Sequence, residues 1–141
     1  MKSFHLTVLE ADEPFFEGEC VSVVIPASDG MYGIMAGHTN FICAVIPGEL
    51  RYKTADGTEY AAAVSSGIFK VENGDVMLLT ESAERAEEID ENRARLEAQQ
   101  AKDEMQHHSS IKSYNAAQAK MVRALNRIRV KGAYQNAHKS R

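Results

Sequence analysis

Apolar and polar residues alternate along the first eighty positions of the chain. Phe4, Leu6 and Val8 fall on one face of an extended segment, which is the period of a β-strand. Further short apolar segments each predict a strand, at residues 21–25, 31–34, 41–46, 49–53, 60–64, 68–71 and 76–80. Between them lie dipeptides that favour tight hairpin turns: Asp29-Gly30, Pro47-Gly48, Asp56-Gly57 and Asn73-Gly74. Many short strands joined by short turns predict an antiparallel sandwich or flattened barrel.

The pattern changes after Thr80. Residues 83–106 contain neither Gly nor Pro and are rich in Ala, Glu, Gln and Arg, so they predict a helix. A second helix is predicted from Ser113, as its N-cap, to about Val130, with Gly132 as the stop signal. Residues 107–110 between them predict the corner of a helical hairpin. The apolar stripes of both helices are narrow, so this hairpin should be only marginally stable alone.

The predicted fold is therefore α+β, with an N-terminal antiparallel β-sandwich followed by a C-terminal two-helix antiparallel hairpin. We predict a sandwich at residues 1–82, a hairpin at 83–131 and a flexible basic tail at 132–141. The formal net charge of −4 hides a gradient, because no Asp or Glu follows Glu104 whereas eight Lys or Arg do. An acidic first helix and a basic second helix attract one another when antiparallel, although each exposed pair contributes only about 0–1 kcal/mol.

Composition excludes several classes of protein. The 141 residues, 44% hydrophobic and 26% charged, provide for one modest core and a small appendage. The chain has no run of eighteen apolar residues and no long apolar segment at its start, so we expect it to be soluble and not exported. Cys20 and Cys43 lack the spacing of a metal site or disulfide framework, so we expect reduced thiols in a cytosolic setting. No metal is predicted, because the adjacent His107 and His108 point in different directions and fit a solvated corner.

Two functional classes compete before any family is considered. The chain has no phosphate loop of the GxxxxGK[ST] type, no HExxH and no nucleophile elbow, so we expect it not to be an enzyme. The basic C-terminal arm could instead make the chain a nucleic-acid-binding protein, held non-specifically by phosphates. The acidic overall charge and the lack of an aromatic stacking platform argue against that alternative.

Four segments, in order, resemble the epsilon subunit of bacterial F-type ATP synthases. They are FHLTVLEADEPFFEGE, IPASDGMYGIMAGHTNFICAVIPGELR, VSSGIFKVENGDVMLLTESAERAEEID and the terminal ALNRIRV. The most specific marks are Gly33-Ile34-x-x-Gly37-His38, Pro47-Gly48 and Ile89-Asp90-x-x-Arg93-Ala94. The resemblance covers residues 1 to about 131. Ala36, where the family commonly has proline, and Ser66, where it commonly has glycine, are departures that concern turns and strand edges.

The resemblance implies a non-catalytic subunit of the central stalk, or rotor. Such a subunit couples gamma to the c-ring in proton- or sodium-driven ATP synthesis, and lies peripherally at the cytoplasmic face of the bacterial cell membrane through the complex alone. In the extended state its hairpin reaches the alpha and beta subunits and inhibits ATP hydrolysis. The family requires no cofactor, and ATP is a regulatory ligand of the folded-down hairpin in some members.

The resemblance also implies three sets of site residues. A loop facing the c-ring would contain Met31, Tyr32 and His38, the alternative for Met31 and Tyr32 being half-burial at one end of the sandwich. Contacts to beta in the extended state would come from Lys120, Arg123, Arg127 and Arg129. A nucleotide site would use Glu84, Ile89, Asp90, Arg93, Arg123 and Arg127.

The chemistry of that nucleotide site is coherent. Arg123 and Arg127 lie four apart and share a helix face, and guanidinium groups from two helices can clamp a triphosphate by charge-assisted hydrogen bonds. Gln100 stands where the tightest-binding relatives have a further arginine, so we expect weaker ATP binding than theirs. The competing interpretation is a solvated helix face, in which Asp90 and Arg93 form an exposed ion pair of about 0.3 kcal/mol.

Overall fold

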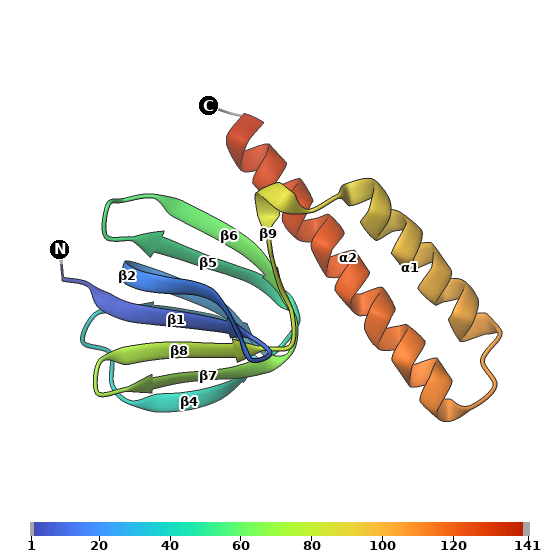
Figure 1. Ribbon diagram of the computed structural model, residues 1–141, viewed down its shortest axis with the longest axis horizontal. Coiled ribbons are helices and arrows are strands. Elements are labelled where there is room, and N and C mark those ends of the chain that lie inside the picture. Colours follow the sequence, from blue (N-terminus) through green and yellow to red (C-terminus); the bar gives the residue numbers. More distant parts are fainter. Residues whose placement is uncertain (1, 140–141) are drawn as a thin grey trace. The chain divides into compact units, whose positions relative to one another are not determined.

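The first 85 residues of the chain form nine strands in the computed structural model. The structure describes residues 2–139, without the side chains of residues 138 and 139. The chain divides into two compact units, Met1–Arg85 and Ala86–Arg141 (Figure 1). The strands of the first unit are β1 (Phe4–Glu10), β2 (Glu13–Ala27), β3 (Gly30–Met35), β4 (Phe41–Val45), β5 (Gly48–Thr54), β6 (Glu59–Val64), β7 (Gly67–Glu72), β8 (Asp75–Thr80) and β9 (Ala83–Arg85).

The long strand β2 organises the sandwich. Its first half pairs with β1, and its second half pairs with β3 on one side and β5 on the other. The strands follow the order β1-β8-β7-β4-β2-β5-β6-β9, and the β1–β2 pairing returns the sheet onto itself. Figure 1 shows β1, β8, β7 and β4 in succession on one side of β2, with β5 and β6 on the other. This arrangement confirms the predicted sandwich.

One strand pairing differs from the antiparallel prediction. β1 runs parallel to β8, with Leu6 opposite Val76 and Glu10 opposite Thr80. The pairing joins the first and last long strands of the unit, and short turn signals carry no information about such distant neighbours. The other pairings among the described residues are antiparallel.

The alternation correctly identifies the core of the sandwich. Side chains from β1, β2, β5, β7 and β8 are buried in one cluster, whose largest fully buried members include Leu6, Ile25, Leu50, Phe69 and Leu78. Burial of such side chains is worth about 1.5–3 kcal/mol each, so these positions supply most of the drive for this unit to fold.

One predicted hairpin turn, at Asn73-Gly74, is confirmed, and another, at Pro47-Gly48, is not. Asn73 and Gly74, with φ of 52° and 86°, join the paired residues Glu72 and Asp75, as a two-residue hairpin of type I′ requires. The hairpin predicted at Pro47-Gly48 is wrong. There β4 and β5 do not pair with each other but lie on either side of β2, with β4 paired to β7 and β5 to β6 as their other neighbours.

The second unit is a helical hairpin. A 3₁₀ turn, η1 (Ala86–Glu88), precedes α1 (Glu91–Gln106), and residues 107–110 form the predicted corner before α2 (Ile111–Lys139). Figure 1 shows α1 and α2 side by side and antiparallel. The buried residues between them are small, chiefly Ala94, Ala101, Ala117 and Ala124, so the hairpin buries little apolar area, as expected. Neither helix in the described part of the chain is both long and apolar enough to cross a bilayer.

Three helix boundaries differ from the sequence prediction. Residues 83–85 form β9 instead of helix, because they pair with residues 62–64 of β6. Ser110, and not Ser113, caps α2, since the backbone N–H of Ser113 donates to Ser110 Oγ at 3.1 Å. Gly132 does not end the helix, which continues to Lys139. A mid-helix glycine costs only about 1 kcal/mol, so the surrounding helix formers outweigh it. Residues 132–139 are therefore helical and not a flexible tail, and residues 140–141 lie outside the described part.

Candidate functional site

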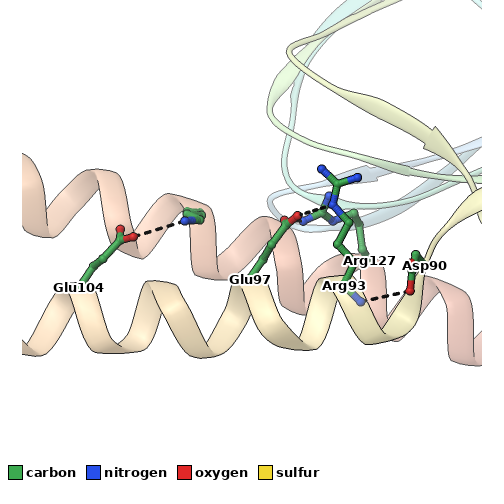
Figure 2. Close-up of polar contacts among 6 residues, drawn as sticks. Asp90, Arg93, Glu97, Glu104 and Arg127 are labelled. Atoms are coloured by element: carbon green, nitrogen blue, oxygen red, sulfur yellow. Dashed lines mark hydrogen bonds and ion pairs between the residues drawn. The ribbon is translucent and has the colours of Figure 1, made fainter.

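The Ile89-Asp90 segment builds the start of α1. Asp90 has an extended backbone, with φ −90° and ψ 104°, and its carboxylate accepts a hydrogen bond from the backbone N–H of Arg93 at 3.1 Å (Figure 2). Ile89, immediately before it, is buried. Asp90 is thus the N-cap of the helix. The ion pair between Asp90 and Arg93 that the competing solvated-face interpretation assumed is not formed, because Asp90 bonds the backbone N–H of Arg93 and the guanidinium contacts Glu97 instead.

Two arginines from different helices meet at one carboxylate. Arg93 of α1 donates from Nε to Glu97 Oε1 at 3.1 Å, and Arg127 of α2 donates from Nη2 to Glu97 Oε2 (Figure 2). The side chains of Glu97 and Arg127 are only 22% and 26% exposed, whereas that of Arg93 is 77% exposed. The structure therefore brings together Arg93 and Arg127, as the nucleotide prediction requires. It also adds Glu97, which that prediction omitted.

The environment of Glu97 favours its charged form. Burial raises the pKa of the carboxyl, but hydrogen bonds and charges from Arg127 and Arg93 outweigh it and hold the pKa below its ordinary value of 4.5. Glu97 is therefore ionised at neutral pH. Arg127 Nε is buried and has no hydrogen-bond partner in the described part of the chain, so this guanidinium retains an unused donor.

The remaining basic residues of α2 fall into two kinds. Lys120 Nζ lies 3.3 Å from Glu104 Oε1 and so pairs across the hairpin, as Arg127 does. Arg123 is exposed, one turn before Arg127, and has no ion pair within residues 2–137. Arg129 is also exposed, and its Nη2 donates to Asn126 Oδ1 at 3.0 Å. Of the four residues predicted to contact beta, two are therefore engaged with α1 in this hairpin.

Glu84 and the hairpin residues belong to different units. Glu84 lies on β9, half-buried and opposite Ala63 of β6 in the strand pairing. The other five predicted nucleotide-binding residues lie in the second unit, where Ile89 is buried and Asp90, Arg93 and Arg123 are exposed. The nucleotide hypothesis therefore rests on the hairpin residues.

The segment predicted to face the c-ring as a loop presents large exposed side chains, although Met31 and Tyr32 lie on strand β3 and not in a loop. Met31 and Tyr32 are exposed and not half-buried, and the Tyr32 hydroxyl donates to Asp29 Oδ2 at 2.6 Å. That hydrogen bond raises the pKa of Tyr32. His38 is exposed, and its ring centroid lies 4.9 Å from that of Phe41. These three residues leave apolar and aromatic surface open to solvent at this end of the sandwich.

Lys131 makes a contact that the sequence analysis missed. Its Nζ donates to the carbonyl oxygens of Ala86 and Glu87, both at 3.2 Å. These carbonyls belong to the 3₁₀ turn before α1, so the ammonium group joins the late part of α2 to the entry of the hairpin. A lysine in a basic arm gives no signal for such a partner, because backbone carbonyls are invisible in a charge pattern.

Comparison with known proteins agrees with this division of the chain. Residues 3–86 match the family model of the ATP synthase delta/epsilon chain β-sandwich domain, and residues 87–132 match that of its long α-helix domain. The ATP synthase epsilon chain of Ruminiclostridium cellulolyticum is 38% identical over 128 residues, covering 91% of this chain and 95% of that relative. The epsilon chain of Thioalkalivibrio sulfidiphilus is 32% identical over 129 residues, covering 91% and 92%.

A solved structure shares the same fold. A chain in the cryo-EM structure of the Euglena gracilis mitochondrial ATP synthase superposes with a TM-score of 0.73 at 22% identity, covering 85% of this chain and 76% of that one. The two family models together span residues 3–132, and both bacterial relatives match 91% of the chain at more than 30% identity. The chain therefore belongs to the ATP synthase delta/epsilon chain family, as a rotor subunit of the ATP synthase.

Proposed function

We propose that the sandwich attaches this chain to gamma and to the c-ring, and so couples the two in proton- or sodium-driven ATP synthesis. The exposed Met31 and Tyr32, with His38, would supply the surface toward the c-ring. The chain itself performs no catalysis, and lies at the cytoplasmic face of the bacterial cell membrane as part of the complex. The bacterial epsilon chains to which it is similar support this assignment.

The helical hairpin restrains ATP hydrolysis when it extends toward the alpha and beta subunits. Its thin alanine interface supports this role, because little apolar contact has to be given up when the helices separate. On extension, Lys120 and Arg127 leave Glu104 and Glu97 and, with Arg123 and Arg129, become available to acidic segments of beta. High salt would weaken those contacts.

ATP regulates this switch by binding the compact hairpin. The observation that carries this step is the convergence of Arg93 and Arg127 on one carboxylate, because two guanidinium groups that share one anion can also share a phosphate. Arg123, exposed one turn from Arg127, adds a third cation. A ligand favours whichever state it contacts, so ATP would hold the hairpin compact and relieve inhibition.

Truncation of the assembled complex tests the inhibitory role. Removing residues from Ser109 onward should raise ATPase activity, since α2 is lost while the sandwich remains. The matched control deletes only residues 140–141, which should leave activity unchanged. Equal hydrolysis by the complex with and without α2, under conditions free of other inhibition, would count against the proposal.

Attachment and nucleotide binding are tested separately. A fragment of residues 1–85, which retains β9, should co-purify with gamma. A folded fragment that does not do so would contradict attachment through the sandwich.

In calorimetry on the full chain, ATP should bind more tightly than ADP, and Arg93→Ala and Arg127→Ala should each weaken ATP binding by at least about tenfold, or about 1.4 kcal/mol. Millimolar ATP without heat would refute ATP binding.

A further inference from the structure

Glu97 accepts hydrogen bonds from the two arginines of the proposed nucleotide site. Its two carboxylate oxygens each accept from a different arginine, Oε1 from Arg93 and Oε2 from Arg127. These are the donors that the proposed nucleotide site assigns to ATP. The carboxylate is part of α1 itself, one turn after Arg93, so it is present at the arginines whenever the hairpin is compact.

We propose that Glu97 is an internal competitor of ATP, a carboxylate that fills the phosphate-binding positions of Arg93 and Arg127 and sets how tightly this hairpin binds nucleotide. The inference rests on the proposed nucleotide site. It concerns a residue outside the set that the family resemblance assigned, and it follows from the contacts of this chain.

Competition follows from the chemistry of the three groups. Carboxylate and phosphate oxygens accept the same guanidinium N–H groups, and both prefer charge-assisted, planar contacts. Glu97 stays ionised at neutral pH because the arginines outweigh the effect of its burial. A phosphate that approached without displacing Glu97 would meet a like charge at short range, which is unfavourable.

Displacement of Glu97 offers a phosphate a donor that the carboxylate leaves unpaired. Arg127 Nε is buried and unpaired within the described residues, and a buried unsatisfied donor is costly. A phosphate oxygen that replaces Glu97 at Nη2 can also accept from Nε once the displacement exposes it. Arg93 is largely exposed, so its side chain can turn from Glu97 toward a ligand at little cost.

The consequence is a hairpin that is compact without nucleotide. Glu97 already joins α1 to α2 through Arg127, so ATP gains only the difference between phosphate contacts and the carboxylate contacts that it replaces. Gln100, which is uncharged where the tightest-binding relatives have arginine, weakens ATP binding, and Glu97 does so as well. Both predict a subunit whose response to ATP is weaker than its arginine content suggests.

The chain provides two matched controls for this idea. Glu91 pairs with Arg95 at 2.8 Å on α1 alone, and Glu104 pairs with Lys120 across the hairpin at 3.3 Å. Glu91→Gln removes an acidic charge from an ion pair within one helix. Glu104→Gln removes an interhelical pair without touching either arginine of the nucleotide site.

Calorimetry on the full chain tests the proposal, with ATP and inorganic triphosphate as probes. Glu97→Gln should tighten the binding of both by about tenfold, equivalent to about 1.4 kcal/mol. Glu91→Gln and Glu104→Gln should stay within about twofold of the unsubstituted chain, apart from any general effect of net charge that the two controls share. Glu97→Asp keeps the charge on a shorter side chain and should fall between the unsubstituted chain and Glu97→Gln.

The outcomes separate this inference from the nucleotide site itself. If the unsubstituted chain binds ATP and Glu97→Gln binds equally or more weakly, competition is overturned and the site stands. If only Glu97→Gln binds, competition stands and ATP regulation of the natural chain is overturned. If neither binds, both are overturned. Hydrogen exchange of the α1 and α2 amides verifies that each variant keeps its hairpin, and Glu97→Asp decides the matter if Glu97→Gln unfolds it.

Discussion

Arg93 and Arg127 should contribute unequally to the stability of the compact hairpin, even though both are assigned to the nucleotide. Arg127 pairs with Glu97 across the two helices, and both side chains are mostly buried, so the contact resembles a charge-assisted hydrogen bond of about 1.5–3 kcal/mol. Arg93 pairs with the same carboxylate within α1 and is largely exposed, a setting worth about 0.3–0.5 kcal/mol. Arg127→Ala should therefore cost several times more than Arg93→Ala.

A double-mutant cycle measures the two contributions separately. Each arginine is replaced by Ala in the presence of Glu97 and of Glu97→Gln, and native-state hydrogen exchange of amides in α1 and α2 gives the free energy of opening the hairpin. The Arg127–Glu97 coupling should exceed the Arg93–Glu97 coupling by about 1 kcal/mol or more. Amides of the sandwich serve as the internal control, since neither substitution lies in that unit.

The pH dependence of the Arg127–Glu97 coupling is a further test. The pKa of Glu97 is lowered in the folded hairpin, so its contribution is fully present above the ordinary value of 4.5 and is lost as pH falls through the folded pKa. The Arg127 coupling should therefore disappear in acid, and Glu97→Gln should remove that acid sensitivity. Equal couplings of Arg93 and Arg127 to Glu97 at neutral pH would refute the claim that a partly buried pair between helices is stronger than an exposed pair within one helix.

Three further predictions concern other parts of the chain. Gly132→Ala should stabilise α2 by about 0.5–1 kcal/mol in hydrogen exchange, because glycine weakens a helix and nothing lies within 4 Å of the added Cβ; no gain would show that α2 is not helical there. Gly67→Ala should lower the melting temperature of the sandwich and reduce its free energy of unfolding by about 1–3 kcal/mol or more, since the added Cβ would clash with the Leu79 carbonyl oxygen. An unchanged melting temperature would contradict that close approach. His5 donates a hydrogen bond to the Glu17 carboxylate, which outweighs desolvation and, with Glu19, raises the pKa of the imidazole, so NMR should find that pKa above 6.5 and Glu17→Gln should lower it. The small stabilisation is lost as pH rises through the folded value, and an identical pKa in the variant would exclude Glu17 as the cause.

The sequence predicts those features of the fold that depend on local pattern. Alternation at Phe4, Leu6 and Val8 identifies buried positions, and Asn73-Gly74 identifies a turn that needs two positive φ values. Prediction from the sequence fails where pairing with a segment far away in the chain determines the structure. Residues 83–85 favour helix by composition, yet the backbone pairs with the edge of β6 instead. The parallel contact of β1 with β8 likewise has no local signature.

The candidate site shows the same limit. The family resemblance selects Arg93 and Arg127, and the structure brings them to one carboxylate. Spacing alone could have suggested a pair between Arg93 and Glu97, which are four apart, but it could not show that Arg127 reaches Glu97 from 30 positions further on. The cap at Asp90 was missed because the helix was expected to start at residue 83. Once a helix begins at Glu91, an aspartate immediately before it is an ordinary N-cap.

The charged contacts of the hairpin also fix the alignment of its two helices. Glu97 and Glu104 are seven residues apart on α1 (104 − 97 = 7), and so are their partners Lys120 and Arg127 on α2 (127 − 120 = 7). The buried alanines repeat at the same interval, Ala94 with Ala101 and Ala117 with Ala124. Sliding one helix by seven residues, about 10 Å, would therefore bring small residues back to the interface and re-form one ion pair with an exchanged partner. Alanine packing sets how closely the helices approach, but it cannot distinguish these alignments. The choice depends on contacts that do not repeat along the helices: the short corner at residues 107–110, Lys131 at the carbonyls of Ala86 and Glu87, and both carboxylates pairing with their own cations at once. A single charge substitution removes half of what the two ion pairs contribute to that choice.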